Sequence, residues 1–301
     1  MRGWAVAALL AVTAAGCATT PAHPAVADPR FVPVVAAENT WGSLAAQLGG
    51  THAQVTSIID NPNADPHDYE ATAGDGIAIA RARLTIVNGV GYDTWASKLV
   101  ATNGSAGRID LDVGDLVGAK PGDNPHRWYN PADVRVVVDR ITEAYQRLDP
   151  ADAGYFAQRR TDVLDNVLRA YFGLIDGIRA DYAGTPVGAS ESIFAMLAPA
   201  LGLDLITPSR LLTAVSEGND PTVADKAAAD AQIADRRIAV YVYNSQNATP
   251  DVRGQVSSAR AHGIPVVAIT ETLVPAGASF QDWQVAPLTA LRQALATATG
   301  K

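Results

Sequence analysis

Two short segments of the chain place a histidine directly after a proline. Residues 65–70 read Asp-Pro-His-Asp-Tyr-Glu, and residues 124–129 read Asn-Pro-His-Arg-Trp-Tyr. Proline fixes its own φ and keeps the residue before it out of helical conformation, so His67 and His126 should each lie on a stiff turn. One such segment is as often a solvated turn as a ligand. Two matching copies indicate a pair of imidazoles that bind a metal ion.

Two glutamates follow predicted strands in the second half of the chain. Glu191 comes just after a strand predicted at 187–189, and Glu271 just after one predicted at 264–269. Open α/β sheets bind ligands beyond the carboxyl ends of their strands. We therefore expect Glu191 and Glu271 to meet His67 and His126 across a cleft.

Two neutral imidazoles and two carboxylates form a mixed nitrogen and oxygen ligand set with a net charge that matches a divalent cation. The set is too rich in nitrogen for calcium. Carboxylates can bind through both oxygens, which favours Mn²⁺ or Fe²⁺ over tetrahedral Zn²⁺, although zinc has the higher raw affinity for most such sites. We rank Mn²⁺ first, Zn²⁺ a close second and Fe²⁺ as a further candidate.

The elements that must position these residues alternate between strand and helix patterns. This alternation predicts an α/β protein of two lobes, each with a parallel four-stranded sheet covered by helices. We expect an N-terminal lobe over 31–149, a long linking helix over 150–183 and a C-terminal lobe over 184–301, with two shorter helices as the alternative for the linker. The predicted strands span 32–36, 55–59, 84–87, 109–113, 187–189, 205–207, 238–243 and 264–269.

The N-terminus resembles that of an exported lipoprotein. Arg2 precedes an apolar stretch that fits a signal peptide over 1–16, and residues 14–17 (Ala-Ala-Gly-Cys) resemble a lipobox in which Cys17 is acylated. Ordinary signal cleavage is the alternative. Residues 17–30 then form a tether, which would hold the protein on the extracytoplasmic face of the cell membrane. The net charge of −8 argues against nucleic-acid binding.

Taken together, these segments resemble the metal-specific substrate-binding lipoproteins of ABC importers, a family with zinc- and manganese-binding members. The resemblance rests on 65–70, 87–95, 124–131, 190–194 and 270–273. It implies that His67, His126, Glu191 and Glu271 are the metal ligands, with Glu at the third position as in manganese members and Glu where the family usually has Asp at the fourth. It also implies a two-lobed fold and delivery of the metal by a monomer to an ABC permease.

Other residues receive smaller roles or none. Tyr69 and Asn88 are expected to orient the histidines, because metal-bound imidazoles usually have a second partner. His23, His52 and His262 share no motif with another histidine, and we assign them no part in this site. Two other functions stay open, a metal-dependent hydrolase and a surface adhesin with a structural metal. Against an enzyme, the chain has no His-Glu-x-x-His motif.

Overall fold

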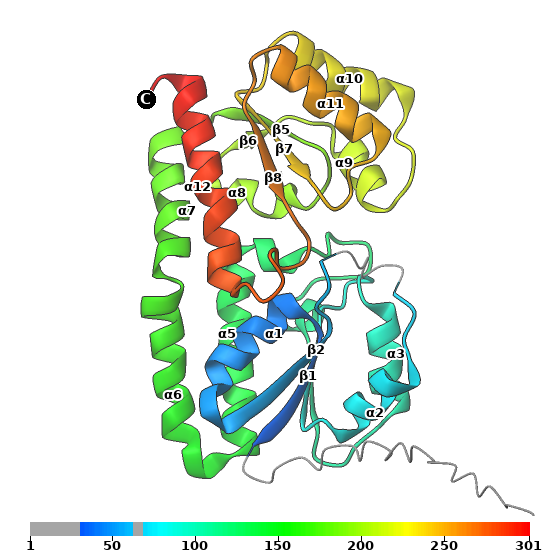
Figure 1. Cartoon of the computed structure of the whole chain (residues 1–301), viewed down its shortest axis with the longest axis vertical. Helices are drawn as coiled ribbons and strands as arrows, with labels where there is room; N and C mark the ends of the chain where they lie inside the picture. Colours follow the sequence, from blue (N-terminus) through cyan, green and yellow to red (C-terminus); the bar gives the residue numbers. More distant parts are fainter. Residues whose placement is uncertain (1–30, 63–68) are drawn as a thin grey trace, which may run out of the picture.

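The computed structural model describes residues 31–62 and 69–301, which form two α/β lobes stacked one above the other (Figure 1). The predicted signal peptide, Cys17 and the tether lie outside the described residues, as does His67. The predicted fold class is confirmed, because each lobe is built on a four-stranded sheet in which all paired strands are parallel.

The sheet of the N-terminal lobe has the strand order β2-β1-β3-β4. Its central strand β3 is buried at every residue, as expected for a parallel sheet covered on both faces. The strands are β1 (Val32–Glu38), β2 (Ala53–Ile59), β3 (Leu84–Val87) and β4 (Ile109–Asp112). The helices of this lobe are α1 (Asn39–Gly49), α2 (Ala73–Arg81), α3 (Thr94–Thr102), α4 (Val113–Leu116) and α5 (Pro131–Leu148).

The sheet of the C-terminal lobe repeats the same pattern with the order β6-β5-β7-β8. Its strands are β5 (Pro186–Ala189), β6 (Asp204–Leu205), β7 (Val240–Asn244) and β8 (Val266–Ile269). Strand β8 begins later than predicted, because Pro265 has no amide hydrogen to add to the ladder. The helices are α8 (Ala198–Leu201), α9 (Ser209–Ser216), α10 (Val223–Ala234), α11 (Pro250–Ala261) and α12 (Phe280–Thr299).

The chain crosses between the lobes along one side of the molecule (Figure 1). It turns at a 3-10 segment (Pro150–Asp152), continues as α6 (Ala153–Asp162), passes through a π-helical segment (Val163–Val167) and ends as α7 (Arg169–Tyr182). Helix α12 packs along α7. None of the helices in the described part of the chain combines the length and apolar character that crossing a bilayer requires.

Side-chain caps explain why the helices begin where they do. The Asn130 side chain accepts a hydrogen bond from the Ala132 amide at 3.0 Å, with Pro131 in the first helical position of α5. Ser279 caps α12 by accepting from the Asp282 amide at 3.2 Å. These two caps fix the residues at which α5 and α12 begin.

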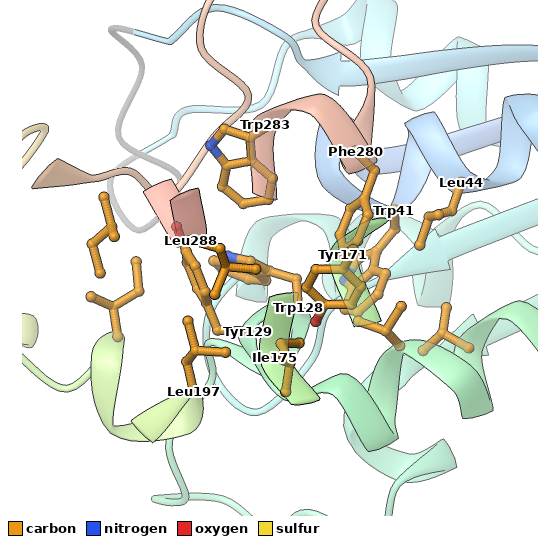
Figure 2. Packing of buried hydrophobic residues seen from close by; sticks show 14 of the residues in the cluster. Trp41, Leu44, Trp128, Tyr129, Tyr171, Ile175, Leu197, Phe280, Trp283 and Leu288 are labelled. Atoms are coloured by element: carbon orange, nitrogen blue, oxygen red, sulfur yellow. The ribbon is translucent and has the colours of Figure 1, made fainter. Parts of the chain in front are cut away.

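One large apolar cluster runs through both lobes, and smaller clusters lie beside it within each lobe. At the lobe boundary, aromatic side chains from α1, the turn before α5, α7 and α12 pack together (Figure 2). Tyr129 lies 5.5 Å from Trp283 and Tyr171 lies 5.9 Å from Phe280, measured between ring centroids. Burying large aromatic side chains dominates the energy of such contacts. The two lobes are therefore held together by packing as well as by the linking helices.

Candidate metal site

His126 lies on a fixed turn at the lobe boundary. The turn ends in a 3-10 segment (Arg127–Tyr129) that leads into α5. The side chain is 1 % exposed, and its Nδ1 lies 2.8 Å from Oδ1 of Asn124. An amide oxygen only accepts hydrogen bonds, so a neutral imidazole at this position carries its proton on Nδ1 and its lone pair on Nε2. This is the tautomer that suits a metal ligand through Nε2.

The side chain of Asn88 holds this turn by a hydrogen bond to its main chain. The side-chain amide of Asn88 donates to the carbonyl oxygen of Pro125 at 2.8 Å, and its Oδ1 accepts from the indole nitrogen of Trp41 at 3.0 Å. Asn88 thus contacts the main chain one residue before His126, and its role in orienting a metal-bound histidine stays a prediction. Removing the amide would release the carbonyl that precedes the imidazole.

Glu191 follows β5 and is 1 % exposed. Its two carboxylate oxygens accept hydrogen bonds from two amides, Asn244 Nδ2 at 2.6 Å and Asn247 Nδ2 at 2.8 Å. Amide donors orient a carboxylate without cancelling its charge. The carboxylate is thus held in place by groups that leave it suited to a cation.

Glu271 follows β8 and lies beside Glu191. The same Asn244 amide donates to Oε1 of Glu271 at 2.7 Å, so one amide bridges the two carboxylates. The hydroxyl of Tyr92, from the N-terminal lobe, donates to the other oxygen at 3.1 Å. Tyr92 is also in edge contact with His126, with 5.9 Å between ring centroids. Tyr92 therefore connects a glutamate of one lobe to the histidine of the other.

A cavity of about 830 Å³ lies at this boundary and is lined by residues from both lobes, among them Asn124, Ser192, Asn247 and Glu271. Asn124 links the two lobes beside this cavity, since its side-chain amide donates to the carbonyl of Ser192 at 2.6 Å. The structure thus brings His126, Glu191 and Glu271 to one boundary. Within the described residues these three do not form a set whose ligand atoms all lie within 4.8 Å of one another.

In the residues that it describes, the structure does not place the two other predicted site residues, His67 and Tyr69, beside His126. His67 belongs to the segment 63–68, outside the described residues. Tyr69 donates its hydroxyl to Asp75 at 3.0 Å, and its ring lies 4.7 Å from that of Trp95. Asp75 is the third residue of α2 and bonds the Thr72 cap. In the described part of the chain, Tyr69 thus contacts the start of α2.

The sequence prediction missed the side chains that orient the carboxylates. Asn244 ends strand β7 at the same sheet edge as Glu191 and Glu271, and it is fully buried. A polar residue at the end of a predicted buried strand was the available signal. Tyr92 was also missed, although it lies in the 87–95 segment that resembles the family.

Two buried carboxyl groups lie in the N-terminal lobe, one of them in contact with the Asn88 amide. Glu38 ends β1 and Asp93 precedes α3, and they are 1 % and 0 % exposed. Asp93 accepts from the amides of Asn88 at 2.6 Å and Gly89 at 2.8 Å. Burial, followed by the charge of Asp93, raises the pKa of Glu38 well above its usual range, and burial raises the pKa of Asp93 to about 6.

These shifts predict a pH-dependent stability. A carboxyl group with a raised pKa in the folded state binds more protons there than in the unfolded state, so its contribution is lost as pH rises through the folded pKa. We expect Glu38→Gln, which keeps the shape of a protonated carboxyl, to gain stability relative to wild type as pH increases from 5 to 9. Thermal unfolding across that range measures it, with the exposed Glu70→Gln as control. A difference between Glu38→Gln and wild type that stays constant with pH would contradict the assignment.

The arrangement as a whole defines a class of protein. Two α/β lobes, with polar side chains from both meeting at the carboxyl ends of their strands, have the architecture of a solute-binding protein. The family model described as the periplasmic component A of the zinc-uptake complex matches residues 34–294. The chain belongs to this family of metal-binding solute-binding proteins.

Individual relatives agree with this family. The chain is 26 % identical over 150 residues to a manganese-binding lipoprotein of Halalkalibacterium halodurans, covering 48 % of this chain and 49 % of that protein. It is 29 % identical over 120 residues to an iron-binding protein of Yersinia pestis, covering 36 % and 37 %. The matches thus span about half or less of these two relatives.

The fold also matches a solved structure. A manganese-bound mutant form of a periplasmic metal-binding protein from Candidatus Liberibacter asiaticus superposes with a TM-score of 0.72 at 18 % identity. The match covers 87 % of this chain and 98 % of that one. At this identity the likeness concerns the fold.

Proposed function

We propose that this chain is an extracytoplasmic substrate-binding lipoprotein that captures a divalent transition metal and delivers it to an ABC importer. His67, His126, Glu191 and Glu271 are the proposed ligands. The observation that carries the proposal is that His126 from one lobe lies at the same boundary as Glu191 and Glu271 from the other. Tyr92 contacts both His126 and Glu271, Asn244 bridges the two glutamates, and Glu271 lines the cavity between the lobes. Because a ligand held by both lobes can be released when they move apart, this layout suits reversible capture.

The buried carboxylates favour a cation as cargo. Glu191 and Glu271 share one neutral amide donor, and two like charges so close together repel each other unless a positive charge lies between them. A divalent ion bound to both oxygens and to Nε2 of His126 would balance them. The ion would also have to draw the ligands closer together than they now lie.

Manganese is the proposed first choice, with zinc a close second and iron as a further candidate. Two glutamates supply up to four oxygen donors, which suits the higher coordination numbers of Mn²⁺ and Fe²⁺. The relatives described above are named for binding manganese and iron, and the family model is described by zinc uptake. These names support the proposed range of metals.

In this account the chain is a carrier and not an enzyme. Four protein ligands fill or nearly fill a coordination shell, whereas metal-assisted hydrolysis needs an open position for water or substrate. The proposed partner is the permease of an ABC importer.

The test is metal accumulation in cells. A strain without this chain should accumulate less manganese, zinc or iron than wild type in metal-limited medium, and the wild-type gene should restore the lost uptake. A His126→Ala gene should not restore it. Unchanged accumulation of all three metals in the deletion strain would contradict the proposal.

Membrane attachment is a separate expectation. If Cys17 is acylated, Cys17→Ser should move the protein from the membrane fraction to the soluble fraction of fractionated cells. A single acyl chain anchors weakly, whereas the three chains of a mature bacterial lipoprotein give durable attachment. Recovery of the wild-type protein in the soluble fraction would favour ordinary signal cleavage.

A further inference from the structure

One set of three metal-ligating side chains lies away from the cleft, in the N-terminal lobe. His52 directly precedes β2, Asp149 follows the last residue of α5, and Asp152 lies in the 3-10 turn before α6. Their ligand atoms all lie within 4.8 Å of one another. This is the one set of three that meets this criterion within 31–62 and 69–301.

The imidazole of His52 is oriented by neighbouring rings. It packs against Tyr155 with 4.2 Å between ring centroids and meets the edge of Phe156 at 5.8 Å. Tyr155 is itself fixed, because its hydroxyl accepts a hydrogen bond from the Thr51 amide at 3.1 Å. With the ring so placed, Nδ1 faces both aspartates, at 3.1 Å from Asp152 Oδ2 and 3.9 Å from Asp149 Oδ2.

These distances fit a metal ion between the three side chains. Zinc binds nitrogen and oxygen ligands at about 2.1 Å, which separates neighbouring ligand atoms by about 3.0 Å in an octahedron and about 3.4 Å in a tetrahedron. One of the two Nδ1 to oxygen distances lies in that range, and the other exceeds it by about half an ångström. Small side-chain shifts would therefore complete the arrangement.

The charge also fits. With neutral His52, the two aspartates bring a charge of −2, and within the described residues no Lys or Arg nitrogen lies within 4.0 Å of their carboxylate oxygens. The neighbouring guanidinium of Arg159 is engaged elsewhere, since it donates to the Gln47 carbonyl and pairs with Asp162 at 3.1 Å. A divalent ion would balance the two carboxylates.

We propose that His52, Asp149 and Asp152 form a second, peripheral site for a borderline divalent transition metal such as Zn²⁺. One imidazole with two carboxylates is the kind of set that zinc accepts, with water completing the shell. The side chains are 27 %, 28 % and 45 % exposed, so water competes for the ion and the site should bind more weakly than a buried one.

The second site is distinct from the cleft. His52 lies at the amino end of β2, whereas the cleft residues Glu191 and Glu271 follow the carboxyl ends of strands. A metal bound at His52 would tie the start of β2 to the corner between α5 and α6. Because these residues come together only in the folded chain, binding would stabilise the N-terminal lobe by mass action.

The test is a Zn²⁺ titration of the full chain, with metal removed beforehand, by competition against a chelating indicator. We expect each wild-type chain to bind one Zn²⁺ equivalent tightly and a second equivalent more weakly. His52→Asn and Asp152→Asn should each weaken the second equivalent at least tenfold and leave the first unchanged. His262→Asn, which changes another histidine at the end of a helix, is the matched control and should change neither.

The outcomes also separate this site from the proposed cleft site, on which it does not depend. His126→Ala should weaken the tight binding of Zn²⁺ and leave the weaker binding unchanged. In His52→Asn, where the weaker binding is lost, added zinc should raise the melting temperature less than it does in the wild type. If His52→Asn retains the weaker equivalent, or if the wild type lacks it, the peripheral site is wrong. If only the tight equivalent is missing, the proposed function fails and the peripheral site stands.

Discussion

His126→Ala should raise the dissociation constant for Mn²⁺ and for Zn²⁺ at least tenfold. The imidazole is buried, its Nδ1 is held by Asn124, and its Nε2 is the proposed ligand. Each tenfold loss corresponds to about 1.4 kcal/mol, less than we expect from removing one ligand of four. His67→Ala should have an effect of the same size, on the resemblance of its segment to the family. Isothermal titration of each metal into the metal-free protein measures both.

The control for this prediction is His262→Ala. His262 follows α11 and precedes the amino end of β8, and its Nδ1 contacts the carbonyl of Ser258 at 2.8 Å. Its removal should leave the tight affinity unchanged. Circular dichroism should show that the His126→Ala protein is folded, because the buried Trp128 and Tyr129 next to it remain. Unchanged affinity in folded His126→Ala would remove this histidine from the site.

Glu191→His should shift selectivity towards zinc, lowering the ratio of the Zn²⁺ to the Mn²⁺ dissociation constant at least tenfold. The change replaces a carboxylate by a third imidazole, which removes oxygen donors and the chance of two-oxygen binding at that corner. The Asn244 and Asn247 amides that now hold the carboxylate would lose an acceptor. Competition between the two metals in one buffer gives the ratio.

Glu271→Asp is the comparison variant for that experiment. It keeps a carboxylate but shortens it by one methylene, and it should weaken both metals because the oxygens move away from Asn244 and Tyr92. The ratio should then change less than in Glu191→His. If Glu191→His leaves the ratio unchanged, Glu191 does not bind the metal and the third ligand must be sought elsewhere.

Much of the fold was predictable because the signals were local. Short, largely apolar runs such as Leu84–Val87 indicate buried parallel strands, and Asn130 before Pro131 marks a helix start. Thr249 before Pro250 follows the same rule, whereas Ser279 caps α12 without a following proline. The π-helical segment Val163–Val167 was not predicted, since the apolar spacing of three and four residues continues through it.

The sequence suggests the proposed ligands, which stay a prediction, but it does not suggest the side chains that contact them. Pro-His turns and acidic residues after strands are visible in the sequence, because they combine a residue type with a local backbone signal. The bridging role of Asn244 depends on strands meeting side by side, and that of Tyr92 depends on contact between the lobes. The cluster of His52 with two aspartates from a distant part of the sequence likewise exists only in the folded chain.

Metal content of the purified protein tests the central claim most directly. Protein prepared without added metal should be analysed for its elements, stripped, and titrated with Mn²⁺ in competition with Zn²⁺. We expect one tightly bound divalent transition metal per chain, lost in His126→Ala, with manganese and zinc competing for the same site. Protein that carries no such metal and binds neither ion tightly after stripping would contradict it.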